Sequence, residues 1–283
     1  MITAAEPLTV KDLKSDIKPI WCPGCGDFGV LNAMLKALTD LKLDPDYVAI
    51  ASGIGCSGRF PAFVKAYGFH GVHGRVLPLA TGIKLANPEL TVFAVGGDGD
   101  AFSIGAGHLP HAARRNVDIT YLVMDNEIYG LTKGQPSPTS PLGMKMKVSP
   151  YGTYDVPLNP IAMVLSYGAS FVARGFSSQP RELAEIIKRG IQHRGFSFIQ
   201  VMSPCVTFFD TYAHFKESAA PLPADHDPAD RLAAIKLALE TDTTYLGVFY
   251  EDQRPVHDAE VKRVQEKAGA GFSFESLLES FKR

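Results

Sequence analysis

Residues 91–132 read TVFAVGGDGDAFSIGAGHLPHAARRNVDITYLVMDNEIYGLT and contain the pattern of one βαβ unit. Thr91–Val95 and Ile119–Met124 are short apolar runs with the β-branched and aromatic residues that are typical of buried strands. Between them, a helical pattern extends from Ser103 to about Arg115. Such connections are right-handed and lay their strands parallel, so both strands are expected to end at the same edge of one sheet. Open α/β sheets bind their ligands at that edge.

A turn rich in glycine and aspartate follows the first predicted strand, with the sequence Gly96-Gly97-Asp98-Gly99-Asp100. Its glycines let the backbone come close to an anion and turn N–H groups toward it. Asn126 follows the second strand, so its amide oxygen and the Asp98 carboxylate are expected to lie together. Both oxygens suit Mg²⁺, which combines a few protein ligands with phosphate and water. The strand–helix–strand context favours this site over an accidental Gly/Asp turn, and the turn has no GxGxxG dinucleotide fingerprint.

The composition is that of an ordinary soluble protein of 283 residues, 46% of them hydrophobic and 20% charged, with a formal net charge of −2. This length suffices for one sizeable core or two small ones. The near-neutral charge gives no reason to expect nucleic acid or an anionic membrane as a partner. No apolar run approaches the roughly 20 residues that span a bilayer. Charges near the N-terminus argue against a signal peptide, so a cytoplasmic location is expected.

The alternation of helical and strand patterns predicts one doubly wound α/β domain with a mostly parallel sheet. Residues 1–20 are expected to form an N-terminal arm, residues 21–215 the main domain, and residues 216–283 a C-terminal tail. Residues 127–154 form a long polar segment, and such loops are usually functional or disordered. Further helices are predicted around Val30–Leu41, within 71–86, and at Ile161–Tyr167, Arg181–Gln192 and Pro228–Glu240, and further strands at Tyr47–Ala51, Ser170–Ala173, Phe196–Met202 and Tyr245–Tyr250.

All four cysteines fall in predicted turns, at Cys22, Cys25, Cys56 and Cys205. Free structural cysteines usually lie in the core, so this placement favours a function over incidental packing. Four thiols suit a structural zinc ion, although zinc usually pairs one CxxC with another. They also suit a [4Fe–4S] cluster, which tolerates scattered spacing. A thioredoxin-like redox pair would not require the last two cysteines. The spacing alone leaves zinc and iron–sulfur open.

Five blocks of the sequence, in this order, resemble the β subunit of the 2-oxoacid:ferredoxin oxidoreductases. They are WCPGCG, SGIGCSGRF, HGRVLPLATGIKLANP, GGDGDAFSIGAGHLPHAARRN and MDNEIYGLTKGQPSPT. The resemblance covers about residues 20–215, and the run YGLTKGQPSPT is more similar to the 2-oxoglutarate branch than to the pyruvate branch. It implies that residues 21–215 bind thiamine diphosphate and an iron–sulfur cluster, and that residues 216–283 contact a partner subunit.

The resemblance also implies a role for each motif. Four thiolates would hold one [4Fe–4S] cluster, and a carboxylate, an amide and a backbone carbonyl would hold Mg²⁺ on the diphosphate. The cluster ligands would be Cys22, Cys25, Cys56 and Cys205, and the Mg²⁺ ligands Asp98, Asn126 and the carbonyl of Ile128. The cofactor would further contact Ile54, Gly55, Cys56, Ser57, Gly97, Gly99, Asp100, Gly130, Leu131 and Thr132.

The histidines and arginines near these motifs have separate expectations. His73 would face the diphosphate or the reacting carbon, or else be a histidine satisfied by protein groups behind the site. His108 and His111 are interpreted as packing residues. The pair Arg114-Arg115 is expected at the solvated end of the crossover helix.

The implied reaction is the oxidative decarboxylation of 2-oxoglutarate to succinyl-coenzyme A and CO₂, with electrons passed through the cluster to ferredoxin. It would be reversible with a low-potential ferredoxin, and so able to fix CO₂. Thiamine enzymes activate the aminopyrimidine with a glutamate on a second domain, and no such domain is evident here. The resemblance therefore implies an α subunit that supplies it, in a dimer of heterodimers.

Alternatives remain. The substrate could be pyruvate or another 2-oxoacid. The chain could instead serve a non-oxidative thiamine-dependent decarboxylase with a structural zinc site. The third hypothesis is that the chain is a non-catalytic, zinc-bound scaffold that binds a partner subunit.

Overall fold

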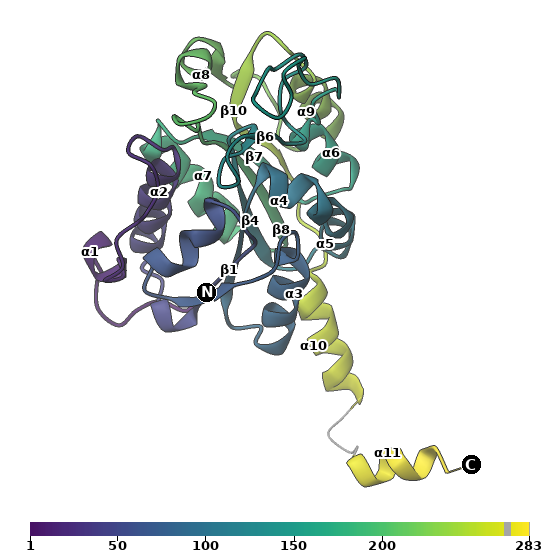
Figure 1. The fold of residues 1–283 in the computed structure, drawn as a ribbon. Coiled ribbons are helices and arrows are strands. Elements are labelled where there is room, and N and C mark those ends of the chain that lie inside the picture. The colour runs from purple at the N-terminus through teal and green to yellow at the C-terminus, as the bar shows by residue number, and fades with distance from the viewer. Residues whose placement is uncertain (269–272, 283) are drawn as a thin grey trace.

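The computed structural model describes residues 1–268 and 273–282, and its centre is one eight-stranded sheet (Figure 1). The strands lie in the order β2-β1-β3-β4-β8-β7-β10-β9. Neighbouring strands are parallel except for the antiparallel pair of β10 with β7. Their bounds are β1 Val48–Ser52, β2 Tyr67–His70, β3 Thr91–Gly97, β4 Ile119–Asp125, β7 Phe171–Phe176, β8 Phe196–Met202, β9 Ala219–Pro221 and β10 Thr244–Glu251. The predicted doubly wound, mostly parallel α/β fold is confirmed.

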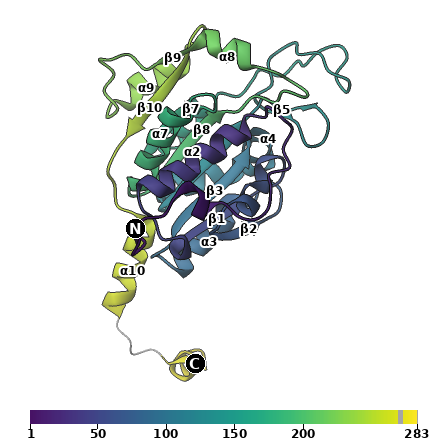
Figure 2. The same ribbon diagram turned by 90° about the vertical axis from the view of Figure 1, so that its left-hand side faces the viewer.

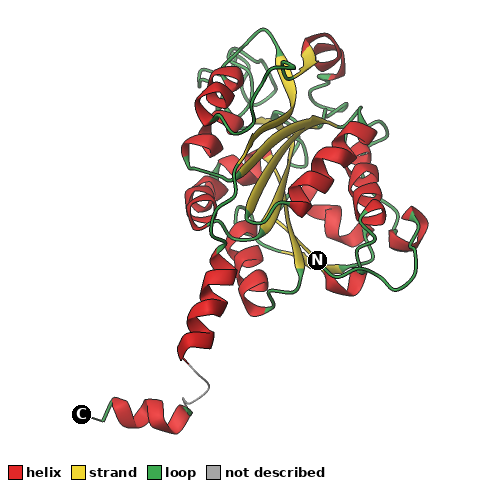
Figure 3. Ribbon diagram, turned by 180° about the vertical axis from the view of Figure 1, so that it is seen from behind, coloured by secondary structure: helices red, strands yellow, loops and turns green. Residues whose placement is uncertain are grey.

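Helices cover both faces of this sheet. On one face lie α2 (Asp27–Asp40) and α7 (Pro180–Gln192), and Figure 2 shows α2 lying across the sheet. On the other lie α3 (Val76–Ala86), α5 (Leu109–Arg115), α6 (Pro160–Ser166) and α9 (Arg231–Ala238). Figure 3 shows the yellow strands running between these two layers of red helices. The sheet is therefore buried on both sides, as its continuous apolar strands require.

Alternation along the central strands builds the two cores. In β3, Phe93 and Val95 face the layer of α2 and α7, whereas Val92 and Ala94 face the other layer. All seven residues of β4 are buried. Strand β4 pairs in parallel with β3 on one side and, over seven residues, with β8 on the other. This pairing fixes the register and holds the carboxyl ends of β3 and β4 at the same edge of the sheet.

The helix predicted from Ser103 to about Arg115 is instead divided into two pieces, and a short helix that was not predicted lies before them. This short helix, α4 (Asp98–Phe102), begins directly after β3. It ends at Ser103, where φ is −91° and ψ is −110°, and a 3₁₀ turn, η3 (Ile104–His108), leads into α5. Gly105 passes so close to the Asp100 carbonyl that an added Cβ would lie 2.3 Å from that oxygen. The glycines of this segment thus allow a tight turn where the apolar pattern predicted a continuous helix.

Edge strand β2 was not predicted, because all four of its residues are exposed and give no pattern of burial. Other short elements outside the sheet are α1 (Val10–Leu13), η1 (Pro45–Tyr47), η2 (Ser57–Phe63), α8 (Tyr212–Ser218), α10 (His257–Ala268), α11 (Phe274–Ser280) and the hairpin of β5 (Ile128–Tyr129) with β6 (Gln135–Pro136). Among the described helices, none has both the length and the apolar composition needed to cross a membrane.

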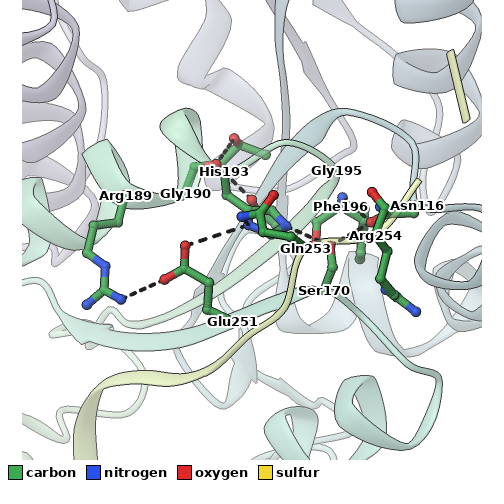
Figure 4. A network of polar contacts seen from close by, with 12 residues as sticks. Asn116, Ser170, Arg189, Gly190, His193, Gly195, Phe196, Glu251, Gln253 and Arg254 are labelled. Carbon is green, nitrogen blue, oxygen red and sulfur yellow. Dashed lines mark hydrogen bonds and ion pairs between the residues drawn. The ribbon is translucent and has the colours of Figure 1, made fainter. Parts of the chain in front are cut away.

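Part of the C-terminal segment belongs to the main domain, because β10 pairs with β7 inside the sheet. A polar network fixes the chain that follows β10 (Figure 4). Asn116, the left-handed residue that ends α5, donates from its side-chain amide to the Pro255 carbonyl at 3.1 Å. Its side-chain oxygen accepts from the Ser170 hydroxyl at 2.6 Å and from the Phe196 N–H at 2.9 Å. Residues 244–255 therefore pack as part of the main domain. Contact of residues 216–283 with a partner subunit stays a prediction.

Candidate functional site

A cavity of about 400 Å³ lies beyond the carboxyl ends of β1, β3 and β4. This is the edge at which the sequence placed a ligand site. All the residues that the resemblance assigned to the cofactor line this cavity: Ile54, Gly55, Cys56, Ser57, His73, Gly97, Asp98, Gly99, Asp100, Asn126, Ile128, Gly130, Leu131 and Thr132. Their individual contacts with a cofactor stay predictions. Asp27, Met124, Tyr129 and Gln135 also line the cavity and were not predicted.

Asp98 begins α4 and is only 2% exposed. Burial, and then the neighbouring carboxyl of Asp125, raise its pKa, while hydrogen bonds from Ser137, Thr139 and the backbone of Asn126 oppose that rise. Two buried carboxyls this close disfavour two negative charges. A bound cation would reverse the effect, because it favours the charged form of each carboxylate. The surroundings of Asp98 therefore fit a cation site.

Asn126 lies at the end of the neighbouring strand and lines the same cavity. Its side-chain oxygen accepts a hydrogen bond from the Ile128 N–H at 3.1 Å. An amide oxygen has two lone pairs, so one is left for a metal ion. Between these residues, Glu127 has φ of +59°, a left-handed conformation that turns the backbone sharply. Asp98, Asn126 and Ile128 thus line the same cavity, and their joint binding of a metal ion stays a prediction.

The long polar segment 127–154 folds back behind the carboxyl pair. The hydroxyl of Thr139 lies 3.0 Å from Oδ2 of Asp98 and 2.9 Å from Oδ1 of Asp125. Ser140 donates from its hydroxyl to the Glu127 carbonyl at 2.5 Å, which closes the loop on itself. The part of this loop around Thr139 and Ser140 is therefore fixed against the carboxyl pair, and Thr139 is the last residue of the quoted motif MDNEIYGLTKGQPSPT.

Glycines give the cavity its shape beside Asp98. A Cβ added to Gly99 would lie 2.1 Å from the ring of Tyr129, whose hydroxyl donates to the Gly99 carbonyl at 3.0 Å. A Cβ added to Gly97 would lie 3.2 Å from the Ser57 hydroxyl. The start of α4 can thus pack this closely against Tyr129 and Ser57 only because these positions lack side chains.

Asp100 and His73 form a second polar group on the cavity wall. Oδ1 of Asp100 accepts from the Ile54 N–H at 2.9 Å and the Gly74 N–H at 2.8 Å, and lies 3.0 Å from Nδ1 of His73. His73 is therefore held by a protein group, and it also lines the cavity, so the structure agrees with a part of each of the two expectations for this residue. Asp100 joins the turn after β1 to the turn before α3.

The four cysteines gather beside the same cavity as free thiols. A point one Cβ bond from Gly130 lies 3.4 Å from Sγ of Cys205 and 4.0 Å from Sγ of Cys56. Burial raises the pKa of the Cys25 thiol, and charges on Asp27, Cys56 and Cys205 raise it further. Burial also raises the pKa of Cys56 to about 12, with further contributions from Asp27, Cys205 and Cys22. Each thiol is thus within electrostatic reach of others in the set.

Backbone contacts hold these turns together. The Gly26 N–H donates to the Pro204 carbonyl at 3.1 Å, which joins the CxxC turn to the loop of Cys205. The Trp21 indole N–H donates to the Cys56 carbonyl at 2.8 Å. In the described part of the chain, no three His, Cys, Asp or Glu side chains are arranged to hold a single metal ion. A cluster spreads its thiolates over several irons, so it makes a different demand on their spacing.

A row of hydrogen-bonded side chains, Arg174, Gln200 and Asp125, was not predicted from the sequence. Arg174 is buried and donates from Nε to the Gln200 amide oxygen at 2.8 Å. Gln200 donates from Nε2 to Oδ2 of Asp125 at 2.7 Å. These partners come from β7, β8 and β4, and only their pairing in the sheet makes them neighbours.

The surface histidines and arginines of the crossover lie outside the cavity. Arg114 and Arg115 are exposed at the end of α5, as expected. His108 lies 2.8 Å from the Arg75 guanidinium, and His111 is exposed, so the expectation that His111 is a packing residue is wrong.

Comparison with known proteins gives consistent results. Residues 53–201 match the thiamine pyrophosphate enzyme family at its C-terminal TPP binding domain, and residues 205–266 match the C-terminal part of the pyruvate ferredoxin oxidoreductase beta subunit. The chain is 45% identical to the 2-oxoacid:ferredoxin oxidoreductase subunit beta of Saccharolobus solfataricus over 249 residues, which is 82% of each chain. It is 40% identical to the 2-oxoglutarate synthase subunit KorB of Methanothermobacter marburgensis over 265 residues, covering 92% of this chain and 93% of the relative.

A solved structure is similar over nearly the whole length. It is the 2-oxoglutarate:ferredoxin oxidoreductase from Magnetococcus marinus with 2-oxoglutarate, coenzyme A and succinyl-CoA bound. The TM-score is 0.95 at 42% sequence identity, and the match covers 98% of this chain and 97% of that chain.

Proposed function

The chain belongs to the family of 2-oxoacid:ferredoxin oxidoreductase beta subunits, and from this premise we propose that it serves in the oxidation of 2-oxoglutarate. The proposed reaction is oxidative decarboxylation to succinyl-coenzyme A and CO₂, with two electrons passed singly through a [4Fe–4S] cluster to ferredoxin. The observation that carries it is the meeting of the Gly/Asp turn and the cysteines at one cavity. The ligands bound to the Magnetococcus marinus enzyme and the name of the Methanothermobacter marburgensis relative support this substrate.

Thiamine diphosphate would supply the carbanion-stabilising chemistry by which a 2-oxoacid loses CO₂. For its part, the chain would hold Mg²⁺ through Asp98, Asn126 and the Ile128 carbonyl, with phosphate and water completing the octahedron. The backbone N–H groups at Gly97 and Gly99 would donate hydrogen bonds to the diphosphate. His73 would hold or transfer a proton at the cavity wall, and its contact with Asp100 at 3.0 Å supports this role.

The cysteines would hold the [4Fe–4S] cluster in which those electrons are received. Their free thiols and their gathering beside the cavity support this assignment. Cys56 both lines the cavity and belongs to the thiol set, so it would bring the cluster next to the reacting carbon. A cluster potential depends on the hydrogen bonds and charges around the sulfurs.

An α subunit would complete the site. Among the described residues that line the cavity, the acidic ones are Asp27, Asp98 and Asp100, and none is a glutamate that could activate an aminopyrimidine. Leu131, which lines the cavity, is 45% exposed, and Val72 and Ile104, beside the His73-Gly74 turn, are 71% and 51% exposed. Apolar side chains grouped in this way are typical of a surface that another subunit covers. Ferredoxin as acceptor and a dimer of heterodimers are further parts of the proposal.

The test is a dye-reduction assay with this chain and its α subunit purified together without oxygen. We expect reduction of a viologen that requires both 2-oxoglutarate and coenzyme A, with slower reduction from pyruvate and other 2-oxoacids. Preference for pyruvate would change the substrate and keep the reaction. Release of CO₂ and an aldehyde without dye reduction, from a protein that contains zinc and no iron, would establish the non-oxidative alternative. Absence of thiamine diphosphate binding would leave only a scaffold role.

A further inference from the structure

One buried carboxylate beside the thiols has no place in the proposed chemistry. Asp27 is the first residue of α2, two positions after Cys25, and is 2% exposed. Its Oδ1 accepts a hydrogen bond from the Ser203 hydroxyl at 2.7 Å. Its Oδ2 is buried and has no hydrogen-bond partner among the described residues. The side chain also lines the cavity.

A role as a helix-capping residue does not account for this burial. A carboxylate in the first turn of a helix gains about 0.3–1 kcal/mol from the helix dipole, and it gains this while exposed to water. Burying a carboxylate with an unpaired oxygen costs more than that. The burial of Asp27 therefore calls for another explanation.

Asp27 lies close enough to the sulfurs to act on them electrostatically. Asp27 lies two residues after Cys25, the Gly26 N–H between them donates to the Pro204 carbonyl at 3.1 Å, and Asp27 lines the same cavity as Cys56. Ser203, which fixes the carboxylate, lies two residues before Cys205. The carboxylate is thus attached to two of the three segments that carry the thiol set, those of Cys25 and Cys205.

We propose that Asp27 is a positioning residue whose negative charge lowers the reduction potential of the [4Fe–4S] cluster held by the four cysteines. The inference rests on the proposed function. One-electron reduction makes the cluster more negative, and a buried carboxylate nearby destabilises that reduced state. Ser203 holds the charge in place and its hydroxyl dipole partly offsets it. With Asp27 present, the reduced cluster gives its electron to an acceptor of low potential more readily.

The test is a potentiometric titration of the cluster, followed by electron paramagnetic resonance, on the anaerobic two-subunit complex at pH 8. Asp27→Asn keeps the shape of the side chain and removes its charge. We expect a higher midpoint, by about tenfold in the ratio of reduced to oxidised cluster at a fixed potential, which is about 59 mV for one electron. Asp40→Asn is the matched control, because Asp40 ends the same helix about 20 Å away. Its midpoint should equal that of the unmodified complex.

An unchanged midpoint in Asp27→Asn with a full complement of iron overturns the inference. A second variant decides the matter if Asp27→Asn does not retain the cluster. Ser203→Ala keeps the charge and removes the hydroxyl that offsets it, so its midpoint should fall, and an unchanged or higher value overturns the inference. An unmodified complex without any iron–sulfur signal would overturn the proposed function itself, which separates the two failures.

Discussion

The hydroxyl of Thr139 lies 3.0 Å from Oδ2 of Asp98, although the two residues are 41 positions apart in the chain. The same hydroxyl lies 2.9 Å from Asp125. A turn in the middle of the long polar segment 127–154 thus supports the carboxylate that is expected to bind Mg²⁺. Ligand residues that are fixed in this way need little rearrangement when the metal binds.

We predict that Thr139→Val destabilises the protein without cofactor by about 1–3 kcal/mol, because it leaves two buried carboxyls without a shared donor. Valine has nearly the same shape, so packing should change little. Urea unfolding measures the difference. Thr81→Val is the control, since the Thr81 hydroxyl bonds the Leu77 carbonyl within α3, away from the carboxyl pair. Equal losses in the two variants would contradict a special role for Thr139.

A second prediction concerns the glycine of the diphosphate turn. Gly99→Ala should weaken thiamine diphosphate binding by roughly tenfold or more, about 1.4 kcal/mol, because its methyl group would meet the Tyr129 ring at 2.1 Å. The fluorescence of the one tryptophan, Trp21, can report binding, since its indole is bonded to the Cys56 carbonyl. Gly82→Ala, in α3, meets nothing within 4 Å. It should leave binding unchanged and stabilise the helix by about 0.5–1 kcal/mol. Normal binding by Gly99→Ala would show that the turn is not at the diphosphate.

The two cofactor sites should be separable by mutation. Asp98→Asn removes the anionic magnesium ligand, so we expect it to lose thiamine diphosphate and to keep its iron. Cys205→Ser removes one cluster thiolate, so it should lose iron and still bind thiamine diphosphate. Iron and sulfide analysis measures the cluster content of each variant, and a titration with thiamine diphosphate measures its cofactor binding. Retention of full iron by Cys205→Ser would remove that residue from the ligand set.

The buried network around His193 should make stability depend on pH. Burial lowers the pKa of His193, Arg254 lowers it further, and Glu251 and Asp118 oppose them. The folded protein therefore binds fewer protons here than the unfolded chain, whose histidine pKa is about 6.5. This contribution to stability is present above pH 6.5 and is lost as the pH falls through the folded pKa. Protonation of His193 would also alter the hydrogen bond between its Nε2 and the Ser170 hydroxyl, which are 2.7 Å apart.

His193→Gln tests this pH dependence, because glutamine does not titrate. Between pH 7 and pH 5, the melting temperature of the unmodified protein should fall more steeply than that of the variant. Parallel curves for the two proteins would contradict the assignment. The experiment uses the protein without cofactors, so that ligand binding does not add its own pH dependence.

The sequence predicted what depends on local patterns. The strands β3 and β4 and the turns after them could be recognised because apolar runs and glycine turns lie within a few residues of each other. The gathering of the cysteines could be expected only from a family resemblance, since Cys205 is far from Cys22 along the chain. Thr139 could not be assigned to Asp98 from periodicity, because their contact depends on how an irregular loop returns.

Other features were missed for different physical reasons. Strand β2 is exposed along its whole length and so has no apolar alternation. Strand β10 was recognised as a strand, but its antiparallel place beside β7 depends on a connection that no local pattern specifies. Asp27 resembles an ordinary helix-starting aspartate, and its burial and its position beside the thiols appear only in three dimensions.

The most direct measurement is the electronic state of the cluster when substrate is added without any external acceptor. The anaerobic two-subunit complex would be mixed with 2-oxoglutarate, frozen at intervals and examined by electron paramagnetic resonance. We predict that the signal of a reduced [4Fe–4S] cluster appears as CO₂ is released, and that it is absent in the Asp98→Asn complex. Release of CO₂ while the cluster stays oxidised would contradict a transfer of electrons between the two sites.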